Sequence, residues 1–318
     1  MSFGRFYLLI LLLILMLGFV GKAAACGTCT IPRLGKDEST VRTESHDKKW
    51  YFEYLFEQKN WDKMDARDAH QLHHQGHHFH DKTTEDYHHL SLGRYVTEDF
   101  KVFAEIPYVI RRSLEIDNHS ILGSQQKSKG FGDLNLIGNY RFWKDDKQSL
   151  SFVGGVKFPT GETKEENSVG TRFEPELQPG SGSYDYVAGG IFKINNQRVS
   201  WTGNMTYVFT TEGAQNFEYG DIFTASLFGD YLINPDSARF KARTGIDMIY
   251  QNERRQKDAG VKVMDSGGEA ILAGPVIKVT AHDGFNLLGS LLHPVYQNLG
   301  GVHQELDFEW MLGGELRW

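Results

Sequence analysis

The chain ends on the stretch ELDFEWMLGGELRW, which runs from Glu305 to Trp318 and alternates almost without fault. The apolar residues of this stretch share one set of alternate positions: Leu306, Phe308, Trp310, Leu312, Leu316 and Trp318. The charged residues share the other set: Asp307, Glu309, Glu315 and Arg317. A period of two with one apolar and one charged face is typical of a β-strand that is buried on one side only.

The same alternation recurs along the chain. We find twelve runs of this kind, near 49–61, 84–96, 99–112, 129–143, 149–159, 183–194, 198–211, 219–233, 238–252, 265–280, 284–294 and 304–318. A tilted strand needs roughly 9–11 residues to cross a lipid bilayer, and these runs are long enough. Strands of soluble sandwiches are nearer five or six residues. A soluble all-β protein shares the glycine-rich and aromatic composition, but the run lengths favour a membrane barrel.

The connections between these runs alternate in length. Five are short and turn-like, at 97–99, 144–148, 195–197, 234–237 and 281–284. Six are longer and polar, at 62–83, 113–128, 160–182, 212–218, 253–264 and 295–303. Short periplasmic turns and long extracellular loops produce this pattern, and lipid forces the sheet to close on itself because it offers no hydrogen-bond partners. We therefore predict a twelve-stranded antiparallel β-barrel over 49–318.

The N-terminus predicts export. Arg5 precedes an apolar run from Phe6 to Val20, and three alanines follow at 23–25. These features are typical of a cleaved signal peptide over 1–25, with an uncleaved anchor as the alternative. Removing it takes away two cations and no acid, so the formal charge of −7 becomes more negative and argues against nucleic-acid partners. The expected location is the bacterial outer membrane.

A short polar segment, 26–48, separates the signal peptide from the first strand and contains Cys26 and Cys29. Two thiols in the oxidising periplasm are expected to form a local disulfide. Lipid modification of Cys26 and binding of a soft metal by both thiols are the alternatives. The segment either enters the barrel as a plug or lies in the periplasm, and the sequence does not decide between the two.

The loop predicted at 62–83 is rich in histidine. Eight of the 13 histidines fall within twenty residues: His70, His73, His74, His77, His78, His80, His88 and His89. Neutral imidazole suits zinc, copper and nickel, so the tract predicts metal capture at the cell surface. A hydrophilic loop without a physiological metal is the alternative. No motif of a catalytic metal site or of a barrel hydrolase is present, and we expect no enzyme activity.

Charged residues on the non-lipid face of the predicted strands are expected to line the interior: Glu105, Asp133, Arg141, Lys157, Arg243, Asp247 and Glu269. Barrels of eight strands are filled by side chains, and those of 16–18 strands hold a water channel. Twelve strands therefore predict a narrow or plugged pore.

Three glycine-rich segments carry a family resemblance: Gly130–Leu134, Gly155–Gly161 and Gly180–Asp185. With Ile106-Pro107-Tyr108 they are similar to outer-membrane barrels grouped as transporters of the phenol-degradation meta-pathway type, distant relatives of fatty-acid transporters. The terminal strand that ends on Trp318 also resembles the C-terminal signature of outer-membrane barrels. The resemblance covers roughly 84–318 and implies passive entry of small molecules through the outer membrane.

Two functions follow as expectations. The first is a channel for a small solute, either a metal ion or metal-linked compound captured by the His-rich loop, or a small hydrophobic or aromatic compound. The second is a metal-binding surface protein in which the barrel is only an anchor. Outer-membrane lipid is a partner in both, and the oligomeric state stays open.

Overall fold

The computed structural model describes residues 49–61, 79–117, 120–196, 198–234, 240–281, 284–299 and 304–318. The signal peptide predicted over 1–25, the segment 26–48 with its cysteine pair and most of the His-rich stretch lie outside the described residues. In the described ranges, no helix is both long and apolar enough to cross a membrane.

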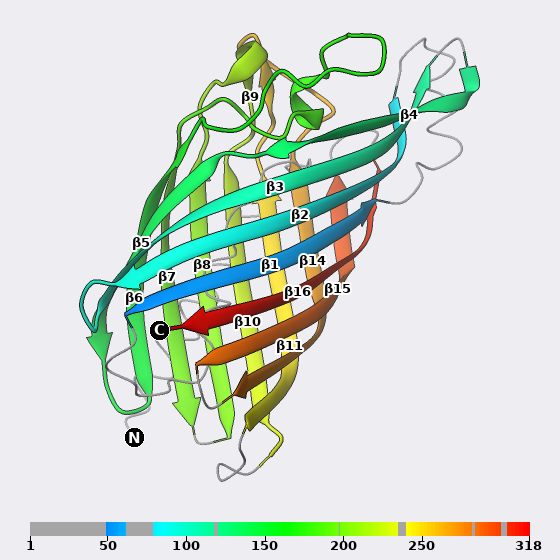
Figure 1. Ribbon diagram of the computed structural model, residues 1–318. Helices are drawn as coiled ribbons and strands as arrows, with labels where there is room; N and C mark the ends of the chain where they lie inside the picture. The colour runs from blue at the N-terminus through cyan, green and yellow to red at the C-terminus, as the bar shows by residue number, and fades with distance from the viewer. Residues whose placement is uncertain are drawn as a thin grey trace.

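Thirteen strands form one antiparallel sheet that closes into a barrel of twelve wall positions, because β1 pairs with β16 on one side and with β2 on the other (Figure 1). The strands of the sheet are β1 (Trp50–Trp61), β2 (Phe79–Tyr95), β3 (Phe100–Asp117), β4 (Ser120–Phe131), β5 (Leu134–Lys144), β6 (Gln148–Phe158), β7 (Asp185–Asn196), β8 (Val199–Phe209), β10 (Ile222–Leu232), β11 (Phe240–Glu253), β14 (Gly268–Ala281), β15 (Phe285–Leu299) and β16 (Leu306–Arg317). The predicted twelve-stranded barrel is confirmed.

Thirteen strands fill twelve positions in the barrel wall because β4 and β5 together occupy a single position beside β3. The first half of β3 pairs with β5, from Phe100 opposite Tyr140 to Glu105 opposite Asn135. Its second half pairs with β4, from Tyr108 opposite Phe131 onward. The run predicted at 129–143 therefore spans an interruption between two strands. The loop predicted at 113–128 is largely the β3–β4 hairpin, which extends beyond the barrel wall in Figure 1.

Each wall strand separates its side chains into a buried row and an exposed row. In β3 the buried row includes Lys101, Phe103, Glu105, Val109 and Arg111. The exposed large side chains of other strands are apolar or aromatic, including Phe52, Phe131, Tyr140, Phe152 and Ile246. An apolar outer row meets lipid and the other row faces the interior, as expected for a barrel that spans a membrane.

The two ends of the barrel differ. The start of β1 and the C-terminus lie at one end, which we call the terminal end, and the strands there are joined by short turns (Figure 1). At the opposite end, the loop end, a small sheet of β9 (Phe217–Glu218), β12 (Lys257–Asp258) and β13 (Val261–Lys262) covers part of the barrel. Two 3-10 helices, Pro175–Leu177 and Ala214–Asn216, lie in the loops beside it.

The loops of this cover pack on one another. The Tyr219 hydroxyl donates to the Pro175 carbonyl at 2.7 Å, and the Gln215 amide donates to the Phe173 carbonyl at 3.2 Å. Phe173, Leu177 and Phe217 are buried. These contacts give the loop end an apolar core of its own, so the loops form a fixed cover over this part of the mouth.

Candidate functional site: the barrel interior and a break in its wall

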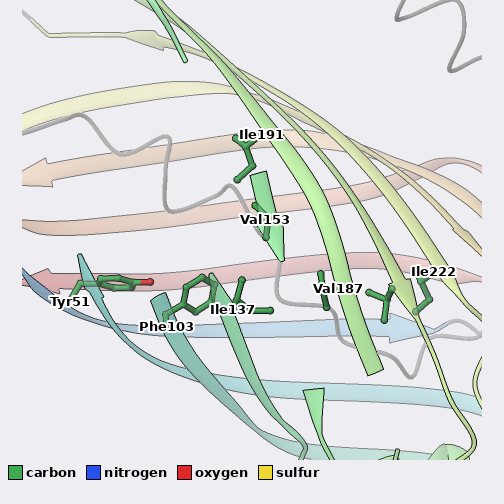
Figure 2. Close-up of a cluster of buried hydrophobic side chains, with 8 residues drawn as sticks. Tyr51, Phe103, Ile137, Val153, Val187, Ile191 and Ile222 are labelled. Atoms are coloured by element: carbon green, nitrogen blue, oxygen red, sulfur yellow. The ribbon is translucent and has the colours of Figure 1, made fainter. Parts of the chain in front are cut away.

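The interior carries a cluster of apolar side chains that a water-filled pore would not need. Its members come from seven wall strands: Tyr51, Phe103, Ile137, Val153, Val187, Ile191, Val208 and Ile222. Figure 2 draws this cluster as sticks and labels all of its members except Val208. A second cluster on the inner row contains Ile249, Leu272, Leu292, Leu306 and Met311. These two clusters lie among the buried polar and charged side chains that make up much of the inner row.

Charged side chains form a ladder along the inner face of β1, β2 and β3. His89 lies between two carboxylates, with Nδ1 3.2 Å from Glu105 Oε1 and Nε2 3.5 Å from Glu57 Oε2. The Lys59 ammonium is 3.5 Å from Glu57 Oε1, one step closer to the loop end. Buried charges need partners of opposite sign, and the alternation along these strands supplies them.

The ladder ends at the loop end in a clamp made by Arg111. Its Nε donates to Glu85 at 2.9 Å, its Nη2 to the Tyr87 hydroxyl at 3.3 Å and its Nη1 to the carbonyl of Gln178 at 2.6 Å. Gln178 belongs to the long β6–β7 loop, and its own side chain bonds back to Glu165 and Phe173 of that loop. Arg111 therefore fastens the β6–β7 loop to the inside of the wall.

The wall is interrupted between β4 and β5, where three glycines bring three segments together. A Cβ on Gly180 would lie 2.6 Å from the Cα of Gly161, and one on Gly161 would lie 2.7 Å from the carbonyl carbon of Gly132. A Cβ on Gly132 would lie 2.8 Å from Pro107 Cγ. Side chains would not fit, so glycine is needed for this close backbone approach. The three glycine-rich segments that carry the family resemblance meet here.

Asp133 holds the interruption closed. Its Oδ1 accepts the backbone N–H of Gly161 at 2.9 Å, and its Oδ2 accepts the backbone N–H and the hydroxyl of Ser181 at 2.8 and 2.6 Å. Lys157 lies 3.5 Å from Asp133 and also forms an ion pair with Asp185. We call the segment 160–163 the strap. These bonds hold the strap, together with Ser181, against the break. The strap fills the gap that the missing strand pairing leaves.

The seven charges predicted for the interior lie in several places. Glu105 belongs to the ladder, and Asp133 and Lys157 to the break. Arg243 and Asp247 lie in the buried row of β11, where Arg243 pairs with Asp230. Arg141 pairs with Asp99 at the terminal end.

Glu269 lies on the outward row of β14. It accepts hydrogen bonds from the hydroxyls of Tyr250 at 2.9 Å and Tyr296 at 3.0 Å. The inward row of this strand consists of its even-numbered residues, such as Leu272 and Val276, and Glu269 is buried on the other row beside these tyrosines. Glu269 therefore does not line the interior.

The predicted metal ligands are only partly visible. His70, His73, His74, His77 and His78 lie outside the described residues, as do Cys26, Cys29 and the side chain of His80. His88 and His89 are adjacent in β2 and so point to opposite faces: His88 contacts the Tyr54 hydroxyl at 2.8 Å, and His89 joins the interior ladder. In the part of the chain that the structure describes, no group of three ligand side chains could hold a metal ion.

Sequence reasoning missed the clamp and the two apolar clusters. Arg111 occupies the same set of alternate positions as Lys101 and Glu105 in its strand, but its partner Gln178 is 67 residues away and shares no pattern with it. The apolar inner residues break the expected alternation of apolar outside and polar inside, and glycine-rich strands such as β6 and β7 obscure it further.

Solved structures share this architecture. An outer membrane channel from Pseudomonas putida F1 superimposes with a TM-score of 0.60 at 16% identity, covering 85% of this chain and 96% of that chain. The beta domain of the Bordetella autotransporter BrkA gives a TM-score of 0.52 at 8% identity, covering 86% of this chain and 100% of that chain. No curated protein sequence matches the chain.

The family profile described as "Putative MetA-pathway of phenol degradation" matches residues 84–296. This span contains the interruption at Gly132, the strap and most of the ladder. The chain therefore belongs to this family, and it is a closed β-barrel of the bacterial outer membrane.

Proposed function

We propose that this barrel is a passive channel that admits small apolar or aromatic solutes through the outer membrane. The observation that carries the proposal is the apolar cluster on the inner row, from Tyr51 to Ile222. An apolar solute would lose its contact with water against these side chains, which favours its passage over that of a sugar or an ion of similar size. The family description, which refers to phenol degradation, supports the same solute class.

The break between β4 and β5 supplies a route out of the interior. A solute that leaves sideways reaches lipid directly and does not have to cross the polar terminal end. In the closed arrangement, Gly161 and Gly180 occupy this route and Asp133 holds them in place. We propose that movement of the strap opens it, and that the Arg111 clamp limits how far the β6–β7 loop moves.

Solute flux in vesicles tests the proposal. The vesicles should contain lipopolysaccharide in the outer leaflet, so that toluene and phenol cross the lipid slowly without protein. We expect the barrel to raise aromatic flux well above that of arabinose. Val153→Asn should lower the aromatic flux several-fold, because it places an amide in the apolar cluster.

Ser151→Asn is the matched control, since Ser151 lies on the same strand and the same buried row but outside the cluster. It should leave the aromatic flux close to that of the wild type. Aromatic flux equal to that of protein-free vesicles would refute the channel. Equal flux in the Val153 and Ser151 variants would refute the role of the apolar cluster.

Metal capture by the His-rich tract remains a prediction of the sequence, supported by eight histidines within twenty residues. It is compatible with the channel, because most of the tract precedes β2 in the sequence and contributes no residue to the apolar cluster. Zinc, copper and nickel are the ions that such a tract suits.

A further inference from the structure

We propose that four cations on the outer surface of β2, β3 and β4 bind the phosphate groups of an outer-leaflet lipid. We call them the outer basic patch: Lys82, Arg112, Lys127 and Lys129. The proposal is independent of the solute and of the channel, because it concerns the outward row of the wall alone.

Strand register places the four residues together. Arg112 lies directly opposite Lys127 across the β3–β4 pair, and Lys129 lies opposite Ile110, two residues along. On the other side of β3, Lys82 lies opposite Leu114. All four are exposed, and 47% of the Arg112 side chain is accessible. Like charges that face each other across a strand pair are destabilising, so Arg112 and Lys127 favour an anion between them. Asp86 beside Arg112 and Glu165 beside Lys129 offset only part of the positive charge.

A hydrogen-bonded network on the outer face holds the Arg112 guanidinium in position. Trp310 Nε1 donates to Gln58 Oε1 at 2.9 Å, and Gln58 Nε2 donates to Asp86 Oδ1 at 2.7 Å. The other oxygen of Asp86 accepts Arg112 Nη1 at 2.7 Å. The remaining N–H groups of Arg112 have no partner among the described residues. A fixed guanidinium with free donors is suited to bidentate binding of phosphate.

The position of the patch matches that of lipid headgroups. The outward residues closer to the terminal end are aromatic and apolar, with Tyr108 packed edge-on against Phe131 at 5.2 Å between ring centroids. The patch begins where this apolar surface stops, on the side of the long loops, which in outer-membrane barrels is the extracellular side. Because the whole chain has a net charge of −7, anionic headgroups would be repelled without such a local positive region.

One other role is available to the two lysines of β4. In the described part of the chain β4 pairs only with β3, and charged residues on an open edge prevent pairing with another chain. The two roles differ in what they predict: a lipid site depends on phosphate, and edge protection depends on protein concentration.

The test uses the full-length protein in detergent. Native mass spectrometry and thermal unfolding would compare bisphosphorylated lipid A, lipid A of the same acylation without phosphate, and inorganic phosphate. We expect wild-type protein to bind the bisphosphorylated lipid at least tenfold more tightly than the dephosphorylated one. Inorganic phosphate at the same concentration should give no thermal shift.

Two variants locate the site. Lys127→Gln with Lys129→Gln, and Arg112→Gln, should each remove most of the preference for phosphate. The double lysine variant should not disturb folding, because neither lysine belongs to the hydrogen-bonded network of Asp86. Lys262→Gln, an exposed lysine of β13, is the control and should keep the preference.

Three results would overturn the proposal. The first is equal binding of the two lipids by the wild type. The second is a shift with inorganic phosphate as large as that with the lipid, which would indicate a free-anion site. The third is a β4 variant that keeps its lipid preference but associates in a concentration-dependent manner, which would assign the lysines to edge protection.

Discussion

At the scale of single residues, Asp133 joins two loop segments to the break in the wall. One carboxylate accepts three hydrogen bonds from two segments that are 20 residues apart in sequence, Gly161 and Ser181. No neighbouring strand could supply these bonds, because the break lies where strand pairing stops. A single side chain thus substitutes for local sheet structure.

Asp133→Ala should therefore lower the free energy of unfolding by at least about 2 kcal/mol, since hydrogen bonds to charged groups contribute about 1.5–3 kcal/mol each and are not additive. Urea unfolding in detergent measures the loss. The same variant should raise aromatic flux, because the strap is released. Asp146→Ala, in an exposed turn, should change neither quantity. An unchanged urea midpoint for Asp133→Ala would show that the strap is held by packing alone.

At the scale of elements, the β6–β7 loop is attached to the wall through the buried pair of Arg111 and Glu85. Both side chains are about 3% exposed. Arg111→Gln leaves a buried carboxylate without its cation, which typically costs about 3–5 kcal/mol. Adding Glu85→Gln should recover part of this loss, and a double-mutant cycle on unfolding free energies measures the coupling.

The exposed pair of Arg141 and Asp99 is the control for this cycle, with side chains 24% and 51% exposed. Arg141→Gln should cost less than about 1 kcal/mol, because exposed ion pairs contribute little. If Arg111→Gln were no more harmful than Arg141→Gln, the clamp would have no role in holding the loop.

At the scale of the whole molecule, the barrel depends on one seam between the first and last strands. Trp50 and Trp318 exchange two backbone hydrogen bonds of 3.0 Å at the end of this seam. Deleting Trp318 should lower the free energy of unfolding by about 1–3 kcal/mol. The loss is measured as a lower temperature at which the folded form disappears on gel electrophoresis. Trp318→Phe keeps both backbone bonds and should melt near the wild type. Identical melting of the deletion and the substitution would locate the effect in the indole.

Much of this architecture could be predicted from alternation. Strands such as β11, with Phe240, Ile246 and Met248 outward and Arg243 and Asp247 inward, follow the two-sided pattern that lipid on one face imposes. The pattern failed beyond the membrane, where no apolar row is required. The β3–β4 hairpin was therefore predicted as a loop, because the sequence from Ser124 to Lys129 is polar on both faces.

The candidate site was less predictable than the fold. Glu269 was assigned to the interior, but Ala270, Ile271 and Leu272 beside it are apolar on both rows, so alternation does not indicate which face is which. The meeting of Gly132, Gly161 and Gly180 depends on the register of strands far apart in sequence. Single-sequence patterns carry no information on that register.

The two adjacent histidines of β2 have a practical consequence. His88 stacks among Tyr54, Phe56 and Tyr108 on the outer surface, and His89 lies with Glu57 and Glu105 inside. Two adjacent residues thus face lipid and the barrel interior at the same depth in the membrane. A photolabel dissolved in the membrane would modify His88, and a water-soluble reagent that reacts with imidazole would modify His89. Analysis of the one proteolytic fragment that contains both would therefore show whether solvent reaches the barrel interior.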